Sequence, residues 1–305
     1  MTKQVIYIGN PAHLYLEHNQ LIVRIKESGE EAAFPMEDLG AVEIDHPQTT
    51  ITAACLQKFM EQCVSVIISD EKHMPSGLML PMVGHTLQQK HGRSQADAAK
   101  PLLKQIWQQT VSAKIQNQAC VLEMLGRPSR EIYVLAKGVK SGDPNNVEGQ
   151  AAKVYWPALM GSDFKREREG RFPNALFNYA YSIVRSMVAR ALVSAGLHPG
   201  LGVFHKNQYN PFALADDIME PYRPIADLWV VNRLAAQSQP REIDREDKRH
   251  FWKLPEVPVR ADGEQKRMAT AISRSATSLA KYFLGESKNI IYPTPCTSIL
   301  TESCG

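Results

Sequence analysis

The chain has 305 residues, of which 44% are hydrophobic and 22% charged, which is typical of a soluble globular protein with one large or two smaller domains. No apolar run approaches the length of a membrane span, and the first residues, MTKQVIYIGN, lack the apolar region of a signal peptide. We therefore expect a cytoplasmic protein without membrane contact. The five cysteines form no CxxC pair, which argues against a disulfide framework or a zinc ribbon.

Charge is distributed unevenly along the chain. Residues 1–80 hold 5 Lys/Arg against 11 Asp/Glu, whereas residues 81–305 hold 30 against 21. A basic C-terminal part suits an anionic partner such as nucleic acid, and an acidic N-terminal part is unsuited to a phosphate backbone.

The first 80 residues alternate between apolar and polar side chains in short runs. Period two with β-branched residues predicts strands, and the pattern of residues 51–62 predicts one helix. The predicted strands are VIYIG at 5–9, HLYLE at 13–17, LIVRI at 21–25, AVEID at 41–45 and VSVIIS at 64–69. Residues 1–80 are therefore predicted to form a small, mainly-β domain.

The pattern changes after a stretch rich in Pro and Gly, which predicts a linker over residues 81–94. Residues 95–288 then carry long segments with a period of 3.6, which predict an all-α domain. The predicted helices are 95–125, 145–160, 174–195, 211–234 and 264–284. Residues 289–305 have no periodicity and are expected to be disordered. The fold class is thus predicted to be α+β, with a mainly-β domain followed by a larger helical catalytic domain.

One short stretch, FHKNQYNPFALADDIMEP at 204–221, places a histidine before a helix with three acids. Asn210 and Pro211 are suited to the N-cap and first position of that helix. Asp216, Asp217 and Glu220 fall on the face opposite the apolar residues, and a solvated acidic surface is one interpretation. Pro221 is expected to end or kink the helix directly after Glu220.

A second helix, starting at DPNNVEGQAAKVYW, places Glu148 at the edge of an apolar stripe. A partly desolvated carboxylate needs a cation, which can be an Arg or Lys side chain in an internal salt bridge or a metal ion.

A third helix, NALFNYAYSIVRSMVARALVSAGL, is apolar almost all round and is predicted to be buried. Asn174, Asn178, Ser182 and Arg185 nevertheless lie on one stripe, which faces either an internal hydrogen-bond network or a polar site such as a bound phosphate. The following loop delivers His205, and a lone histidine is most often structural or solvated.

Together, Glu148, His205 and Glu220 are candidate ligands of one divalent cation. Two carboxylates and one imidazole suit Mg²⁺ or Mn²⁺, whereas a structural zinc site prefers four Cys or His ligands.

The segments DPNNVEGQAAKVYW, FNYAYSIVR and GLHPGLGVFHKNQYNPFALADDIMEPYRPIADLWV resemble the three signature segments of the CRISPR adaptation integrase, the nearly universal Cas protein that inserts new spacers. Their order and spacing fit along nearly the whole chain, and LADDIMEPYRP is especially like the version found in type II systems.

The resemblance implies that Glu148, His205 and Glu220 bind the metal, although some members of the family have Asp in place of Glu220. It implies that Asp217 supports this site or a second metal, and that Arg185 and Lys206 contact DNA phosphates, as Asn178 on the polar stripe would. It also implies a homodimer formed through the N-terminal domain, assembly with a small ferredoxin-like subunit on prespacer and repeat DNA, and, in type II systems, contact with the effector nuclease.

The expected reaction is therefore spacer acquisition in antiviral defence, in which a DNA 3′-hydroxyl attacks a phosphodiester without a protein nucleophile. Two alternatives remain, namely a metal-dependent endonuclease that uses water and a DNA-binding scaffold that turns over nothing. A zinc hydrolase is disfavoured because the chain has no HExxH motif.

Overall fold

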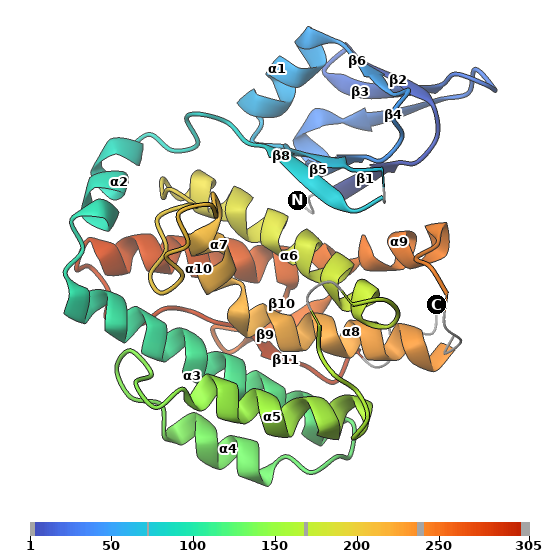
Figure 1. Ribbon diagram of the computed structural model, residues 1–305. Helices are drawn as coiled ribbons and strands as arrows, with labels where there is room; N and C mark the ends of the chain where they lie inside the picture. The colour runs from blue at the N-terminus through green and yellow to red at the C-terminus, as the bar shows by residue number, and fades with distance from the viewer. Residues whose placement is uncertain (1–3, 72, 168–169, 237–240, 300–305) are drawn as a thin grey trace.

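The computed structural model describes the chain except for residues 1–3, 72, 168–169, 237–240 and 300–305. A strand-rich N-terminal domain stands on a larger helical domain, and one extended segment connects them (Figure 1). The α+β class predicted from the sequence is confirmed. Among the helices of the described residues, none combines the length and apolarity needed to cross a membrane.

The N-terminal domain consists of two sheets and one helix. The first sheet has the order β1-β5-β7-β8, in which only the last pair is antiparallel. The second has the order β4-β3-β2-β6. The elements are β1 (Gln4–Ile8), β2 (Ala12–Glu17), β3 (Gln20–Ile25), β4 (Glu31–Pro35), β5 (Leu39–Ile44), β6 (Thr50–Ile51), α1 (Ala53–Glu61), β7 (Ser65–Ser69) and β8 (Pro75–Met79).

Strands β5 and β7 contribute to two hydrophobic cores at once. Val42 and Val66 are buried in the core of the N-terminal domain. Their neighbours Ala41 and Ile67 are buried in the core of the helical domain. Because successive side chains of a strand point to opposite faces, one face of this sheet packs inside its own domain and the other packs on the helices.

Buried polar contacts also join the two domains. The Glu43 carboxylate is fully buried and accepts a hydrogen bond from the Tyr179 hydroxyl, at 2.9 Å. Directly after β5, Asp45 pairs with Lys248, with 2.5 Å between Oδ2 and Nζ, and accepts from the hydroxyl of Tyr7. The interface between the domains therefore contains buried hydrogen bonds and an ion pair beside its apolar contacts.

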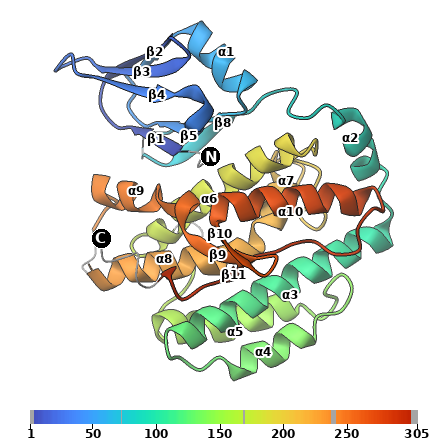
Figure 2. The same ribbon diagram turned by 180° about the vertical axis from the view of Figure 1, so that it is seen from behind.

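In the helical domain, α6 runs along the side that faces the N-terminal domain in both views (Figure 1, Figure 2). This helix packs against β7 and β8 on one side and against α8 and α10 on others, so the predicted burial of its apolar surface is confirmed. The helices are α2 (Gln88–Ala96), α3 (Lys100–Met124), α4 (Arg130–Lys137), α5 (Val147–Met160), α6 (Asn174–Ser194), α7 (Ala213–Ile218), α8 (Arg223–Ala236), α9 (Arg245–Phe251) and α10 (Met268–Phe283).

The linker and the first predicted helix differ from expectation. The segment 81–94 was expected to be a linker, but α2 begins at Gln88, so only residues 80–87 lie outside helices and strands. The helix expected over 95–125 is two helices, because the chain breaks between Ala96 and Lys100, just before Pro101. Proline suits the first turn of a new helix and not the middle of a continuous one.

The end of the helical domain also contains a small sheet that the sequence did not predict. Strands β9 (Pro258–Ala261), β10 (Glu264–Arg267) and β11 (Thr294–Pro295) have the order β10-β9-β11. The helix expected from residue 264 therefore starts at Met268. The disorder expected for 289–305 is wrong for 289–299, where Ile290 and Ile299 are buried. The rest of that segment, 300–305, lies outside the described residues.

Candidate active site

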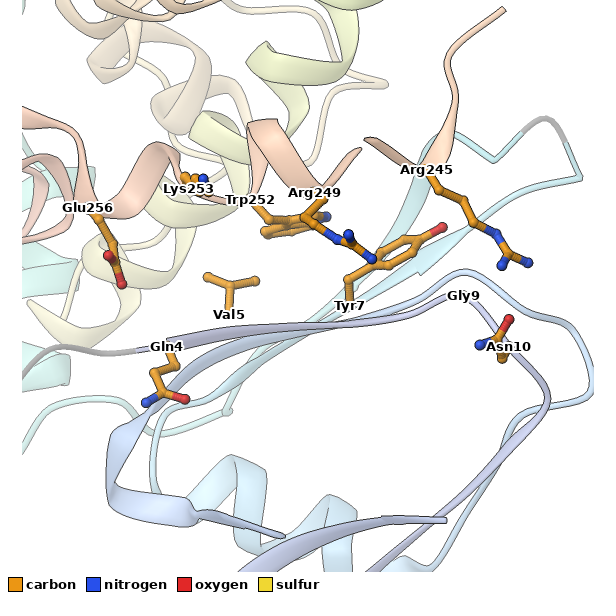
Figure 3. A pocket seen from close by; sticks show the side chains of 10 residues that line it. All are labelled: Gln4, Val5, Tyr7, Gly9, Asn10, Arg245, Arg249, Trp252, Lys253 and Glu256. Carbon is orange, nitrogen blue, oxygen red and sulfur yellow. The ribbon is translucent and has the colours of Figure 1, made fainter. Parts of the chain in front are cut away.

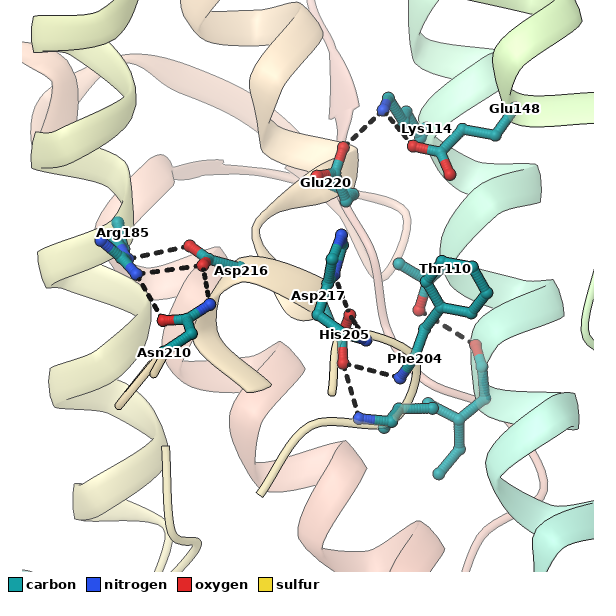
Figure 4. A network of polar contacts seen from close by, with 12 residues as sticks. Thr110, Lys114, Glu148, Arg185, Phe204, His205, Asn210, Asp216, Asp217 and Glu220 are labelled. Carbon is teal, nitrogen blue, oxygen red and sulfur yellow. Dashed lines mark hydrogen bonds and ion pairs between the residues drawn. The ribbon is translucent and has the colours of Figure 1, made fainter. Parts of the chain in front are cut away.

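Two predicted ligands, Glu148 and Glu220, meet at one ammonium group (Figure 4). Lys114, in the middle of α3, places Nζ 2.6 Å from Glu148 Oε1 and 2.5 Å from Glu220 Oε2. The Lys114 side chain is 13% exposed, and those of Glu148 and Glu220 are 23% and 6% exposed. Three segments distant in sequence therefore converge on a largely buried cluster of charges.

The start of α5 fixes the direction of Glu148. Asn146 is the N-cap, with φ of 49°, and its side chain accepts from the Gly149 backbone N–H. Asp143 lies three residues before the N-cap, and its carboxylate accepts from the N–H groups of Val147, at 2.8 Å, and Glu148, at 3.1 Å. Two acceptors thus satisfy the first backbone donors of the helix and place Glu148 in its first turn.

Glu220 lies at a break between two helices, which fixes its position. Helix α7 ends at Ile218, a 3-10 turn covers Glu220–Tyr222, and α8 begins at Arg223. This agrees with the break predicted at Pro221. Helix α7 begins at Ala213, not at Pro211, and Asn210 instead accepts from the Phe212 N–H.

Burial also decides the interpretation of the acidic helix. Asp217 is 0% exposed and Glu220 4% exposed, whereas Asp216 is only partly buried. These two acids therefore do not form a solvated surface.

The charges around Glu220 balance one another. Burial opposes ionisation of Glu220, but Arg223, with Nε 2.9 Å from Oε1, and Lys114 outweigh it, so the pKa of Glu220 lies below its usual value. Burial disfavours the charged form of Lys114, yet Glu220 and Glu148 together raise the pKa of its ammonium. The surrounding charges therefore favour the charged forms of both Glu220 and Lys114.

His205 is held by Asp217. The ring Nδ1 lies 2.6 Å from Asp217 Oδ1. The same carboxylate accepts from the backbone N–H groups of Val203, Phe204 and His205, at 2.6, 3.0 and 3.2 Å. The hydrogen bond to Asp217 raises the pKa of His205 against the effect of burial. In Figure 4 the ring lies between Asp217 and Glu220. With Nδ1 occupied, Nε2 is the nitrogen available to a ligand.

The loop that carries His205 is packed tightly on both sides. A Cβ on Gly202 would lie 2.3 Å from the carbonyl oxygen of His205, so only glycine allows this close approach. The ring of Phe204 stacks on that of Trp107 in α3, with centroids 4.2 Å apart. The imidazole is therefore positioned before any substrate arrives.

The polar stripe on α6 is mainly an internal network. Arg166 donates to the side-chain oxygens of Asn174 and Asn178, at 3.1 and 2.7 Å. The Ser182 hydroxyl donates to the Tyr179 carbonyl of its own helix, at 2.6 Å. Of the two interpretations left open from the sequence, the contacts of Asn174 and Asn178 support the network.

The two remaining candidates, Arg185 and Lys206, differ in their contacts and exposure. The guanidinium of Arg185 contacts Asp216 at 2.8 Å, from Nε to Oδ1, and donates to Asn210. Lys206 is exposed and, with His205, lines a pocket of about 360 Å³ beside α2 and α3. Lys206 is therefore open to an anion, whereas Arg185 is engaged within the protein.

The donor atoms of the predicted ligands show whether these residues suit Mg²⁺ or Mn²⁺. Glu148, Glu220 and His205 offer carboxylate oxygens and an imidazole nitrogen, which these ions accept. Within the described part of the chain, no three His, Cys, Asp or Glu side chains are close enough together to hold an ion. The donors fit the ion in kind, while the position between the two glutamates is held by the ammonium of Lys114.

The sequence analysis did not identify Lys114 and Arg223 as residues of the site. Lys114 is the only charged residue between Lys104 and Glu123, within a helix whose neighbouring positions Val111 and Gln118 are buried. A lone charge on a buried helix face signals a buried partner. Arg223 lies three residues after Glu220, a spacing at which side chains meet on one side of a helical turn.

A separate pocket of about 530 Å³ lies between β1 and α9, away from this cluster (Figure 3). It is lined by Tyr7 of the N-terminal domain and by the basic residues Arg245, Arg249 and Lys253. None of the predicted site residues lines it, so this pocket is not the candidate active site.

Comparisons with known proteins identify the family of the chain and proteins of similar fold. Residues 6–253 match the family described as CRISPR associated protein Cas1. The chain is 35% identical over 280 residues to the CRISPR-associated endonuclease Cas1 of Neisseria meningitidis serogroup C (strain 8013), covering 91% of each chain. Its fold is similar to a casposase bound to its integration product, with a TM-score of 0.76, 21% identity and coverage of 95% of this chain and 92% of that chain. It is also similar to a chain of a Cas6-RT-Cas1–Cas2 complex, with a TM-score of 0.72, 20% identity and coverage of 94% and 36%.

Proposed function

Because the chain belongs to the family of the CRISPR associated protein Cas1, we propose that it is a divalent-metal-dependent DNA integrase of CRISPR adaptation. In this reaction the 3′-hydroxyl of an incoming DNA end attacks a phosphodiester at the edge of a repeat. The new phosphodiester forms as the old one breaks, and the strand released carries a 3′-hydroxyl. The name of the Neisseria relative, an endonuclease, supports action on the phosphodiester bonds of a nucleic acid.

One observation carries the assignment to this site. Glu148 and Glu220 converge on a single cation, and His205, oriented by Asp217, lies beside Glu220. We propose that Glu148, Glu220 and His205 Nε2 hold Mg²⁺ or Mn²⁺. When bound, the ion would supply Lewis acidity toward the phosphodiester and the leaving oxygen.

The residues around these three have separate tasks. Asp217 fixes the ring of His205 through Nδ1, an arrangement common for histidines that bind metals. Arg223 offsets the charge of Glu220. Lys206, which is exposed beside the histidine, is placed to contact a DNA phosphate.

The proposal includes an assembly. We propose a homodimer that acts with a small ferredoxin-like subunit on prespacer and repeat DNA. The fold likeness to a chain of a Cas1–Cas2 complex supports such a partner.

A strand-joining assay tests the function. A labelled short duplex is mixed with a supercoiled plasmid bearing the repeat, Mn²⁺ and the partner subunit, and label transfer to the plasmid is scored. Joining is expected with a 3′-hydroxyl end and is lost with a 3′-hydrogen end, while binding persists. Glu148→Ala, His205→Ala and Glu220→Ala should each abolish joining, whereas Glu131→Ala, at an exposed site on α4, should not.

Two outcomes contradict the proposal. Equal plasmid nicking with either end and no label transfer indicates an endonuclease that uses water. DNA binding that is unaffected by chelation, together with no turnover under any condition, indicates a scaffold.

A further inference from the structure

Lys114 occupies the place between the two glutamates that a bound cation would need. Its ammonium lies 2.6 Å from Glu148 Oε1 and 2.5 Å from Glu220 Oε2. Both distances are those of ion pairs. Glu148 belongs to α5, and Glu220 belongs to the 3-10 turn. One lysine therefore holds together the carboxylates that the proposed function assigns to the metal.

The cluster already contains equal numbers of positive and negative charges, so binding of an added divalent cation is costly. Glu148 and Glu220 supply two negative charges, and Lys114 and Arg223 supply two positive ones. A divalent ion added to this balanced and largely buried group would leave an excess positive charge with little water to solvate it. It would also seek the same carboxylate oxygens as the ammonium.

We propose that Lys114 is a displaceable internal cation that keeps Glu148 and Glu220 together before an ion binds and sets the affinity of the site for that ion. This inference rests on the proposed function. Lysine suits the task because its ammonium is a compact charge on a flexible four-carbon stem and can leave without moving α3. Lys114 is thus a positioning residue that lowers the affinity of the metal site while preserving its shape.

Titration of Mn²⁺ into the purified full chain, followed by calorimetry and by the loss of the free-ion electron paramagnetic resonance signal, tests the proposal without any assay of activity. Lys114→Gln removes the competing charge and is expected to bind Mn²⁺ at least about tenfold more tightly than the parent. That factor is at the lower end of what a hydrogen bond to a charged group contributes. Lys114→Arg keeps a cation and should bind as weakly as the parent. Lys100→Gln, an exposed position on the same helix, should change nothing.

Thermal unfolding gives a second measurement. In a chelator, Lys114→Gln should melt at a lower temperature than the parent because the two glutamates then repel each other. Mn²⁺ should raise its melting temperature by more than it raises that of the parent, since tighter binding to the folded state stabilises it more. If Lys114→Gln is unfolded in the chelator, folding on addition of Mn²⁺ supports the proposal, and failure to fold overturns it.

The outcomes separate this proposal from the proposed function. Equal or weaker Mn²⁺ binding by Lys114→Gln, with binding still lost in Glu220→Ala, overturns the role of Lys114 and leaves the metal site intact. No Mn²⁺ binding by the parent or any variant overturns the metal assignment itself.

Discussion

Two lysines with little solvent exposure lie 2.5 Å from a carboxylate, but one contacts a single acid and the other contacts two. Lys248 lies 2.5 Å from Asp45, the one acid with which it forms an ion pair among the described residues, and donates to the Tyr7 hydroxyl at 3.3 Å. Lys114 lies equally close to Glu220 but is shared with Glu148. The first contact joins the two domains, and the second joins segments of the helical domain.

The difference shows which buried ion pairs are structural. Asp45 is surrounded by donors, because Lys248, Tyr7 and His73 all contact its carboxylate. Its charge is matched by the ammonium of Lys248. At Lys114 two acids from separate segments share one ammonium, and Glu220 also pairs with Arg223. Burial alone does not distinguish the pairs, whereas the number of acids that share the cation does.

The largest expected effect comes from breaking the contact between the domains. Lys248→Met leaves the Asp45 carboxylate buried without a cation, which should lower the free energy of unfolding by about 3 to 5 kcal/mol. Urea denaturation of the full chain measures this change. Lys253→Met, at an exposed position five residues along, should stay within about 0.5 kcal/mol of the parent. An equal loss in both variants would show that the pair is not what stabilises the junction.

A smaller effect of pH follows from the same pair. Burial opposes ionisation of Asp45, but the hydrogen bonds from Lys248, Tyr7 and His73 outweigh it, so its pKa in the folded state is lowered. A lowered pKa contributes stability that is present above the unfolded value of about 4 and is lost as the pH falls through the folded value.

The stability advantage of the parent over Lys248→Met should therefore shrink between neutral pH and about pH 3. Unfolding free energies of both proteins, measured across this range, give the difference directly. A difference that stays constant, or grows as the pH falls, would contradict the assignment of this pair as the cause.

The smallest effect on stability is expected at the shared lysine. Glu148→Gln removes one of two acids from Lys114 but leaves Glu220 paired, and Glu148 is the more exposed acid. The loss should be about 1 kcal/mol or less, although strand joining should disappear. Urea denaturation beside the joining assay shows whether the two quantities separate. A loss as large as that of Lys248→Met would make this pair a structural contact like that of Asp45.

The sequence predicted the elements that have a strong period and missed those without one. Alternation identified β1, β2, β3, β5 and β7, but EAAFP and PSGLM, which form β4 and β8, contain few apolar residues in alternation. The strands β9 and β10 are short and are set by a turn with positive φ at Asp262 and Gly263. Such strands depend on their neighbours in the sheet more than on their own residues.

For the candidate site, too, local sequence patterns predicted only part of the arrangement. The helical face indicated that Glu148 is poorly solvated, because that depends on residues within two turns. The same kind of pattern placed Glu220 opposite the apolar residues, although the structure buries it. The identity of their cation depends on how α3 packs against α5 and on where the chain turns at Pro221, which local pattern does not determine. The buried Asp217, which was assigned to the face opposite the apolar residues, shows the same limit.

The two-sided burial of β5 and β7 has a consequence for synthesis on the ribosome. Ala41 and Ile67 are covered by the helical core, much of which is made later in the chain. At typical elongation rates, the roughly 100 residues between β8 and α6 take about 5 to 20 s to synthesise. During this interval the nascent N-terminal domain presents an uncovered apolar sheet face, so a chaperone that shields such faces should associate with ribosomes paused before α6 and leave after it.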